Sequence, residues 1–200
     1  MMTGYVKTRK VAVTGGIGTG KSYICKLLGE HGIRVYDCDA AAKRLMALDE
    51  TLQQAICRLV GPDAYHDGVL QKNKLAQFLL GSAQHRQALD DIIHPAVASD
   101  FIHSGMQWLE SAIFFDSGFD RRVDVDIVVC VSAPLEVRVQ RVMSRDGISR
   151  EKALEWIRNQ LPQNEVEKRS DLVIVNDGKV DLETEVSRLL HTIGNMPEKP

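Results

Sequence analysis

The chain lacks any hydrophobic run long enough to cross a membrane. Its longest clean apolar run, Ile127 to Val131, is far shorter than the roughly 20 residues that a membrane-spanning helix needs. The first residues, Met1 to Lys10, hold no apolar core of the kind found in signal peptides. We therefore expect a cytoplasmic protein that has no membrane partner.

Cysteine is scarce and widely spaced. The cysteines form no C-x-x-C pair, and no histidine stands beside one in the spacing typical of metal ligands. This spacing argues against a structural metal site and predicts reduced, packed thiols. The residues concerned are Cys25, Cys38, Cys57 and Cys130.

Neither sign of charge is in large excess. The 25 basic and 27 acidic residues leave a formal net charge of −2, so no strong field favours nucleic acid or an anionic membrane. Any basic site must therefore be local, and we expect no nucleic-acid partner. The hydrophobic fraction of 44% over 200 residues is enough for the core of one globular domain.

One short segment carries a recognisable chemistry. Residues 15–22 read GGIGTGKS, which fits the phosphate-binding pattern G-x-x-x-x-G-K-[ST] at each fixed position. Consecutive N–H groups of such a loop turn inward around an anion, while Lys21 reaches the outer phosphates and the Ser22 hydroxyl ligates Mg²⁺. An apolar strand over 11–14 precedes the loop and a helical pattern over 22–31 follows it, as this mechanism requires. The residues predicted to bind the nucleotide are Gly16, Ile17, Gly18, Thr19, Gly20, Lys21 and Ser22.

Strand-like segments alternate with helical patterns along the chain. This alternation predicts an α/β fold, in which helices cover both faces of a five-stranded parallel sheet and ligands bind at the carboxyl ends of the strands. Together with the glycine-rich loop, it indicates a sandwich of the P-loop NTPase type. The predicted strands are Val11–Thr14, Arg34–Asp37, Ala112–Asp116, Asp126–Val131 and Leu172–Asn176.

The spacing of these strands is uneven. Residues 40–107 form a mostly helical stretch that is far longer than one crossover helix needs, which predicts an inserted helical subdomain. Within it, Asp67-Gly68 marks a turn, and His94-Pro95 is expected to end one helix and begin the next. A second long stretch between predicted strands, charged and polar, predicts a helical lid over 145–170. The core then consists of residues 9–39, 108–144 and 171–200.

Two carboxylates follow the second predicted strand. Asp37 and Asp39 stand two residues apart, so on an extended chain they point to the same side, at the sheet edge beside the phosphate loop. One can act in the hydration shell of Mg²⁺, and the other can orient or accept the proton of an attacking hydroxyl. The alternative is that one of them caps the helix that begins near Ala40.

Three arginines lie along one face of a helix predicted over 134–144. Arg138, Arg141 and Arg145 are spaced at i, i+3 and i+7. Such a stripe is often only solvated surface, but this one follows a strand end, where a guanidinium can stabilise charge on a transferring phosphate. Asp116, at the end of the third predicted strand, has two possible roles: a Mg²⁺ ligand through water, or a turn residue.

Taken in order, a series of motifs makes the chain resemble the dephospho-coenzyme A kinase family over nearly its whole length. A generic P-loop kinase shares the first two motifs, whereas the later ones in this order are specific. The motifs are residues 14–22, Asp37-Cys38-Asp39, Asp67-Gly68-Val69-Leu70, His94-Pro95, Phe115 to Asp120, Arg141 to Gly147, and Asn176-Asp177-Gly178.

The resemblance implies ATP- and Mg²⁺-dependent phosphorylation of the ribose 3′-hydroxyl of dephospho-coenzyme A. By matching positions, Asp39 resembles the catalytic base of the family. Lys21 and Arg141 resemble its phosphate-stabilising cations, and Ser22 resembles the hydroxyl on the metal side.

We further expect Asp37 beside the metal and Arg145 beside the nucleotide. In the family, an insert of this kind is the acceptor-binding domain, and the segment corresponding to 145–170 is its lid.

The chain departs from the family pattern at two places. Family members usually carry Pro-Leu-Leu-Phe-Glu at the third strand, where this chain has Ala112 to Asp116, so the acceptor wall is expected to differ in shape. They commonly carry Gln-x-Pro-Arg in the lid, whereas here Gln160-Leu161-Pro162 is followed by Gln163. The basic residues that then compete for the lid's nucleotide contact are Arg158, Lys168 and Arg169.

Two other functions fit the loop alone. Another small-molecule P-loop kinase, acting on a nucleoside, sugar or shikimate-like hydroxyl, would keep the loop and the paired aspartates but would not need so long an insert. A nucleotide-dependent switch would use the same loop to change its contact with a partner. Guanine-specific switches carry an Asn-Lys-x-Asp element that Val175 to Gly178 lacks, so adenine is the favoured base.

Overall fold

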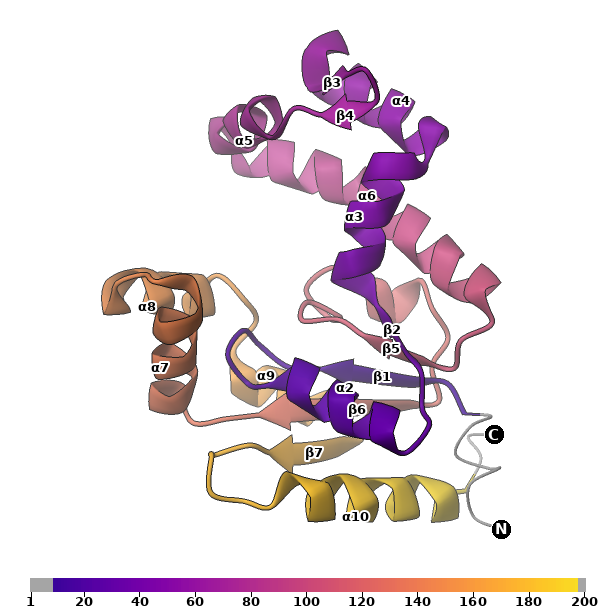
Figure 1. The fold of residues 1–200 in the computed structure, drawn as a ribbon, viewed down its shortest axis with the longest axis vertical. Coiled ribbons are helices and arrows are strands. Elements are labelled where there is room, and N and C mark those ends of the chain that lie inside the picture. The colour runs from indigo at the N-terminus through magenta and orange to yellow at the C-terminus, as the bar shows by residue number, and fades with distance from the viewer. Residues whose placement is uncertain (1–8, 198–200) are drawn as a thin grey trace. The chain divides into compact units, whose positions relative to one another are not determined.

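The computed structural model describes residues 9–197 and contains two compact units (Figure 1). The helical unit is residues 37–105. The sheet unit holds the chain on either side of it, which within the described range is residues 9–36 and 106–197.

A five-stranded sheet forms the centre of the sheet unit, with its strands in the order β2-β5-β1-β6-β7 (Figure 1). β1 lies in the middle, where Val13 stands opposite Glu110 of β5 and Val129 of β6 in parallel register. The predicted α/β fold with a five-stranded parallel sheet flanked by helices is confirmed. The strands are β1 (Val11–Thr14), β2 (Val35–Asp37), β5 (Trp108–Glu110), β6 (Ile127–Ser132) and β7 (Leu172–Val175).

Helices α2 (Lys21–Glu30) and α10 (Leu182–Asn195) cover one face of this sheet. Val13 and Val129 are fully buried in the same apolar cluster as Ile24 of α2. Alternate side chains of a strand share one face, so these residues lie on the face that α2 packs against. Burying one such side chain is worth about 1.5–3 kcal/mol, so the cluster holds the start of α2 firmly behind the end of β1.

The segment between β6 and β7 is helical. α7 (Leu135–Asp146) ends at Gly147, whose φ of 64° lies in the left-handed region that favours glycine at helix ends. It is followed by α8 (Arg150–Arg158) and α9 (Gln163–Lys168). A small buried cluster joins α7 to α8, so these two helices pack as a pair.

The third predicted strand is wrong in position. The strand that lies between β2 and β1 is β5, at 108–110, whereas residues 112–116 form tight turns. The apolar run that suggested a strand instead folds back on itself, so that the ring centroids of Phe114 and Phe119 lie 6.2 Å apart. Apolar periodicity over so few residues cannot separate a buried strand from a buried turn. A short 3-10 helix, η2 (Phe119–Arg121), follows these turns.

The helical unit contains one hairpin, four α-helices and one 3-10 helix within the described residues. Asp67 and Gly68, both with positive φ, form the turn between β3 (Tyr65–His66) and β4 (Val69–Leu70), as the sequence predicts. The other elements are α3 (Cys38–Leu48), α4 (Glu50–Val60), the 3-10 helix η1 (Pro62–Ala64), α5 (Lys72–Gly81) and α6 (Ala83–Ser104).

The predicted helix break at His94-Pro95 is wrong. α6 runs without interruption from 83 to 104, with Pro95 inside it. A proline inside a helix costs about 3 kcal/mol or more through a lost hydrogen bond and a steric clash. Buried residues on both sides of it, among them Leu89, Val97 and Phe101, provide packing that offsets this cost.

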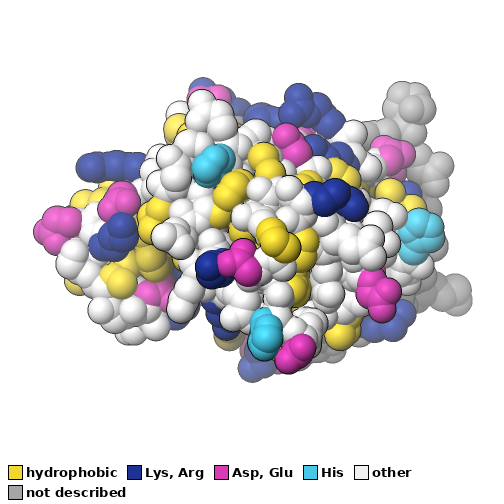
Figure 2. Space-filling view, turned by 90° about the horizontal axis from the view of Figure 1, so that it is seen from above, with side chains coloured by type: hydrophobic (Ala, Val, Ile, Leu, Met, Phe, Trp, Pro, Cys, Tyr) yellow, Lys and Arg dark blue, Asp and Glu magenta, His cyan; other side chains and the backbone are white. Residues whose placement is uncertain are grey.

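Charges of both signs stand on the face of the molecule that Figure 2 draws. Figure 2 shows acidic and basic side chains interspersed on one face rather than gathered by sign, as the near balance of the two in the sequence leads one to expect. Across residues 9–197, none of the helices combines the length and the hydropathy that a membrane span requires.

Candidate active site

The glycine-rich loop lies between β1, the central strand, and the N-terminus of α2. Gly20 caps α2 with a φ of 92°, and a Cβ at this position would lie 2.2 Å from Nδ2 of Asn176. Only glycine meets both demands. Inside the loop, the buried Thr19 hydroxyl donates to the Gly16 carbonyl at 2.9 Å, which fixes the curve of the loop. The loop thus leads directly into the N-terminus of α2, the positive end of the helix dipole, as an anion site requires.

Lys21 sits where the motif predicts, with only 8% of its surface exposed. Its Nζ lies 3.4 Å from the Gly16 carbonyl oxygen and 3.7 Å from Oε1 of Glu110. The ammonium is therefore held at the base of the loop, between a backbone carbonyl and a carboxylate.

Glu110 was missed by the sequence reasoning. It ends β5 beside β1, with 14% of its side chain exposed, and it occupies the strand-end position that the misplaced third strand gave to Asp116. Asp116 instead lies in the turns that follow β5, where its Oδ2 accepts a hydrogen bond from the Leu161 N–H at 2.8 Å. The turn role of Asp116 is the one that the structure supports.

The arginine stripe on α7 divides into two parts. Arg138, only 5% exposed, donates from Nε to the Ile17 carbonyl at 2.9 Å. Arg141 donates to the Thr19 carbonyl at 3.3 Å and the Asn176 carbonyl at 3.2 Å. Two guanidinium groups thus converge on the loop.

The third arginine of the stripe has a different partner. Arg145 is largely exposed and pairs with its neighbour Asp146 at 2.7 Å. That hydrogen bond raises the pKa of Arg145. Burial, by contrast, lowers the pKa of Arg138 because a guanidinium loses hydration there. An arginine pKa lies so high that Arg138 still keeps its charge near neutral pH.

Asn176, just past the end of β7, is a second residue that sequence reasoning did not assign to the site. It is 4% exposed, and its Nδ2 donates to the Thr19 carbonyl at 2.9 Å. Its Oδ1 accepts from Arg141 Nη2 at 2.9 Å. The sequence signal for this residue was the Asn176-Asp177-Gly178 motif. The buried hydrogen bonds of Asn176 give a reason for asparagine at this position.

Two glutamines reach the loop from the α8–α9 turn, which we define as residues 159–163. The Ile17 N–H donates to Oε1 of Gln160 at 2.7 Å, and the Gly16 N–H lies 3.5 Å from Oε1 of Gln163. Gln163 also donates from Nε2 to the Cys130 sulfur at 3.2 Å. Burial raises the pKa of Cys130 to about 11, so this sulfur is a neutral thiol near neutral pH.

Two of the three basic residues that competed for the lid's nucleotide contact form ion pairs elsewhere in the sheet unit. Arg169 pairs with Asp120 at 2.7 Å and stacks over the Phe115 ring at 4.0 Å. Lys168 pairs with Glu165 at 2.9 Å, and Arg158 is exposed near the end of α8.

Asp37 and Asp39 flank the beginning of α3. Asp37 is the N-cap of this helix and accepts from the Ala40 N–H at 2.9 Å, so its capping role is established. Asp39 is exposed in the first turn, where a carboxylate is favoured by the helix dipole. The metal and base roles of these two residues stay predictions.

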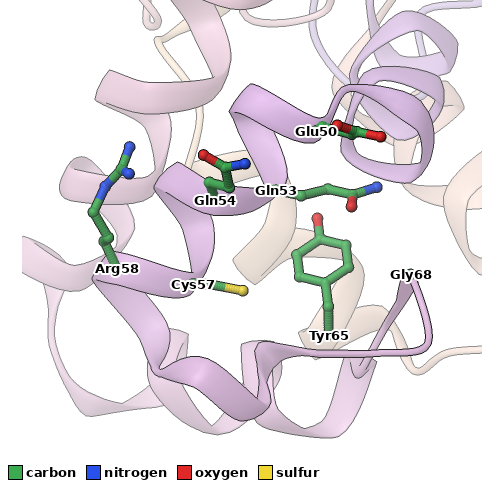
Figure 3. Close-up of a pocket in the computed structure, with 7 residues that line it drawn as sticks. All are labelled: Glu50, Gln53, Gln54, Cys57, Arg58, Tyr65 and Gly68. Atoms are coloured by element: carbon green, nitrogen blue, oxygen red, sulfur yellow. The ribbon is translucent and has the colours of Figure 1, made fainter.

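The helical unit has a hollow of its own (Figure 3). It has a volume of about 510 Å³ and opens beside Tyr65, whose hydroxyl donates to the Met46 carbonyl at 2.8 Å. Burial raises the pKa of Tyr65 to about 12, so the hydroxyl stays protonated. The hollow is lined by Glu50, Gln53, Gln54, Cys57, Arg58, Tyr65 and Gly68.

Solved structures share this fold. A crystal structure of a protein from Thermus thermophilus matches with a TM-score of 0.77 and 31% identity, covering 94% of this chain and 98% of that one. A shikimate kinase from Acinetobacter baumannii matches with a TM-score of 0.59, covering 96% of this chain and 97% of that one. At 14% identity, it is alike in fold alone. A parallel sheet with a glycine-rich loop at its central strand defines the P-loop class of nucleotide-binding folds, an architecture that this chain shares with the kinase above.

The particular family follows from sequence. The family model described as dephospho-CoA kinase matches residues 9–181. A dephospho-CoA kinase from Bacteroides fragilis is 38% identical over an alignment of 192 residues, and the match covers 90% of this chain and 91% of the relative. The chain belongs to the dephospho-CoA kinase family, whose members are transferases that catalyse the last step of coenzyme A biosynthesis.

Proposed function

We propose that this protein transfers the terminal phosphoryl group of ATP to the ribose 3′-hydroxyl of dephospho-coenzyme A. Family membership supports the substrate pair. The observation that supports the reaction site is the convergence of Lys21, Arg138 and Arg141 on one glycine-rich loop.

The cations act mainly by neutralising charge. The transferring phosphoryl group is loose and rich in negative charge, so catalysis requires positioned positive groups more than covalent chemistry. In this proposal, the ammonium of Lys21 moves from the Gly16 carbonyl to the outer phosphates, and Arg141 adds a guanidinium to the same charge. Arg145 joins them at the nucleotide when its bond to the exposed Asp146 is exchanged.

Asp39 is the proposed base. Its exposed carboxylate in the first turn of α3 would orient the acceptor hydroxyl and take its proton. Asp37 would lie on the metal side, and its capping bond to Ala40 would hold the start of α3 in place for both functions.

Oxygen donors at the start of α2 and at the end of β5 fit Mg²⁺. Ser22 supplies a hydroxyl and Glu110 a carboxylate in the sheet unit, and hard oxygen donors of this kind suit that ion. No cage of three or more acidic, histidine or cysteine side chains occurs within residues 9–197, and Mg²⁺ in phosphate-transfer sites usually takes only one or two protein ligands. When bound, the ion would offset phosphate charge alongside Lys21.

The remaining parts of the chain divide the other tasks. The helical insert, residues 40–107, would bind the acceptor, and residues 145–170 would form the lid that excludes water from the reacting groups. We propose the cytoplasm, where ATP is supplied, as the site of the reaction.

An acceptor panel tests this function. Purified protein is incubated with ATP and Mg²⁺ together with dephospho-coenzyme A, adenosine, shikimate or gluconate, and ATP consumption is followed. We expect consumption that matches the amount of dephospho-coenzyme A, with ³¹P NMR placing the new phosphate on the ribose. Preference for another acceptor would indicate a different small-molecule kinase, and slow turnover that ignores every acceptor would favour a nucleotide switch.

A further inference from the structure

The N–H groups of Gly16 and Ile17 belong to the loop that the motif assigns to phosphate binding, yet side-chain carbonyl oxygens already face them. Gln160 accepts from the Ile17 N–H at 2.7 Å, and Gln163 lies 3.5 Å from the Gly16 N–H. A Cβ added at Gly16 would lie 3.1 Å from the same Gln160 oxygen, which shows how closely the side chain enters the loop.

An amide oxygen is a weak substitute for a phosphate oxygen. Both accept hydrogen bonds from backbone N–H groups, but the amide oxygen carries only a partial negative charge. Two such oxygens, side by side on adjacent N–H groups, therefore occupy the positions that an anion would take.

The α8–α9 turn that delivers these glutamines is anchored on several sides. Asp116 accepts from the Leu161 N–H at 2.8 Å, and Gln163 contacts the Cys130 sulfur at 3.2 Å. Arg138 spans the two partners, because it donates to the Ile17 carbonyl at 2.9 Å and lies 3.4 Å from Oε1 of Gln163. Ile17 itself packs against the buried cluster of α7 and α8. The contact is thus built from several elements of the sheet unit.

We propose that Gln160 and Gln163 are gating residues of the nucleotide site: their carbonyl oxygens hold the Gly16 and Ile17 N–H groups until a phosphate displaces them. This rests on the proposed function, in which residues 15–22 bind the phosphates of ATP. Binding of nucleotide then opens the α8–α9 turn, and departure of nucleotide lets the turn close again. Gln163 has this role at the position where the family commonly carries arginine, so this half of the gate is particular to this chain, whereas Gln160 matches the glutamine of the family pattern.

A consequence is that the glutamines weaken nucleotide binding. A nucleotide must compete with the closed turn, and its apparent affinity is lowered by the fraction of molecules that are closed. Replacing Gln160 by methionine keeps the length and bulk of the side chain but removes the oxygen. For a contact worth one ordinary hydrogen bond, we expect ATP, ADP and tripolyphosphate to bind about 3- to 10-fold more tightly.

The test is calorimetric titration of these three ligands into Gln160→Met, without acceptor. Gln163→Arg is the second variant, because it restores the family pattern, and it should tighten binding further in a manner that salt weakens. Gln140→Met is the matched control, since Gln140 is exposed on α7 and the same chemical change there should leave affinity unchanged. A thermal melt followed by far-ultraviolet circular dichroism checks that each variant is folded.

A second readout follows the amides themselves. In ¹⁵N spectra of the wild type, the Gly16 and Ile17 resonances should move when tripolyphosphate is added, and in Gln160→Met the Ile17 resonance should already be displaced without ligand. Unchanged or weaker ligand binding in a folded Gln160→Met protein would overturn the gate. Undiminished ATP binding by Lys21→Ala would instead overturn the phosphate site on which the gate rests, so the two failures are distinguishable.

Discussion

Arg141 and Asn176 form a hydrogen-bonded pair that supports the glycine-rich loop. Arg141 Nη2 donates to Asn176 Oδ1 at 2.9 Å, and Asn176 Nδ2 donates in turn to the Thr19 carbonyl at 2.9 Å. The pair connects α7, the end of β7 and the loop, three segments that are far apart in sequence. The guanidinium proposed to meet the phosphate is therefore positioned by a buried amide.

Replacing Asn176 by alanine tests this support. The change removes a buried side chain whose partners, Arg141 and the Thr19 carbonyl, lose hydrogen bonds. We expect the free energy of unfolding to fall by about 1–3 kcal/mol, and ATP affinity to fall with it. Urea unfolding and calorimetry measure the two effects. Asn164→Ala, an exposed asparagine on α9, is the control, and equal losses in both variants would contradict the role of Asn176.

Lys21→Ala should weaken both ATP binding and turnover, because its charge meets the phosphates in the ground state and in the transition state. We expect turnover to fall by at least about 100-fold. Lys26→Ala is the control on the same helix, since its side chain is 71% exposed. Steady-state kinetics and ATP titration give the measurement, and similar behaviour of the two variants would remove Lys21 from the mechanism.

Asp39→Asn should separate chemistry from binding. The amide keeps the shape of the side chain but cannot accept the proton of the acceptor hydroxyl. Turnover should therefore fall by about 100- to 10,000-fold while ATP affinity stays nearly intact. Asp124→Asn, an exposed carboxylate in the sheet unit, should leave both quantities unchanged. Normal turnover in the Asp39 variant would show that the base lies elsewhere.

Asp37 can be tested for its two roles by comparison with Asp49. Both are N-caps whose carboxylates accept a backbone N–H, Asp37 on α3 at 2.9 Å and Asp49 on α4 at 3.0 Å. Alanine at either position should lower the free energy of unfolding by about 1 kcal/mol. Only Asp37→Ala should also raise the Mg²⁺ concentration needed for half-maximal turnover. If the two variants need the same Mg²⁺, Asp37 is a cap and nothing more.

Stability at high pH should depend on Cys130. Its pKa is raised from 9.0 to about 11 by burial, so the unfolded chain loses this proton at lower pH than the folded protein does. The free energy of unfolding should therefore fall between pH 9 and 11, by at most about 1.4 kcal/mol per pH unit from this group. Denaturant titrations across this range compare the wild type with Cys130→Ala, whose slope should be shallower. Identical slopes would show that the thiol titrates normally.

Prediction from the sequence succeeded where a local pattern determines the structure. The loop at 15–22 needs particular glycines, a lysine and a hydroxyl in fixed order, so the motif alone locates both the strand before it and the helix after it. The Asp67-Gly68 turn was predictable for the same reason, because both residues take positive φ there.

It failed where long-range packing decides. β5 has only three residues, and nothing in Trp108-Leu109-Glu110 marks it as a strand until β1 is placed beside it. Glu110 was missed with that strand. The glutamine contacts to Gly16 and Ile17 join residues more than 140 positions apart, which no local pattern encodes.

The loop at 15–22 is proposed to hold ATP for transfer to dephospho-coenzyme A, and the mass of the acceptor after the reaction reports this transfer. Wild-type protein and the Lys21→Ala variant are each incubated with ATP, Mg²⁺ and dephospho-coenzyme A, and the mass of the acceptor is measured by mass spectrometry. We expect an acceptor heavier by one phosphoryl group with the wild type and almost no such product with the variant. An unchanged acceptor with folded wild-type protein, or equal product from both proteins, would rule out this role of the loop.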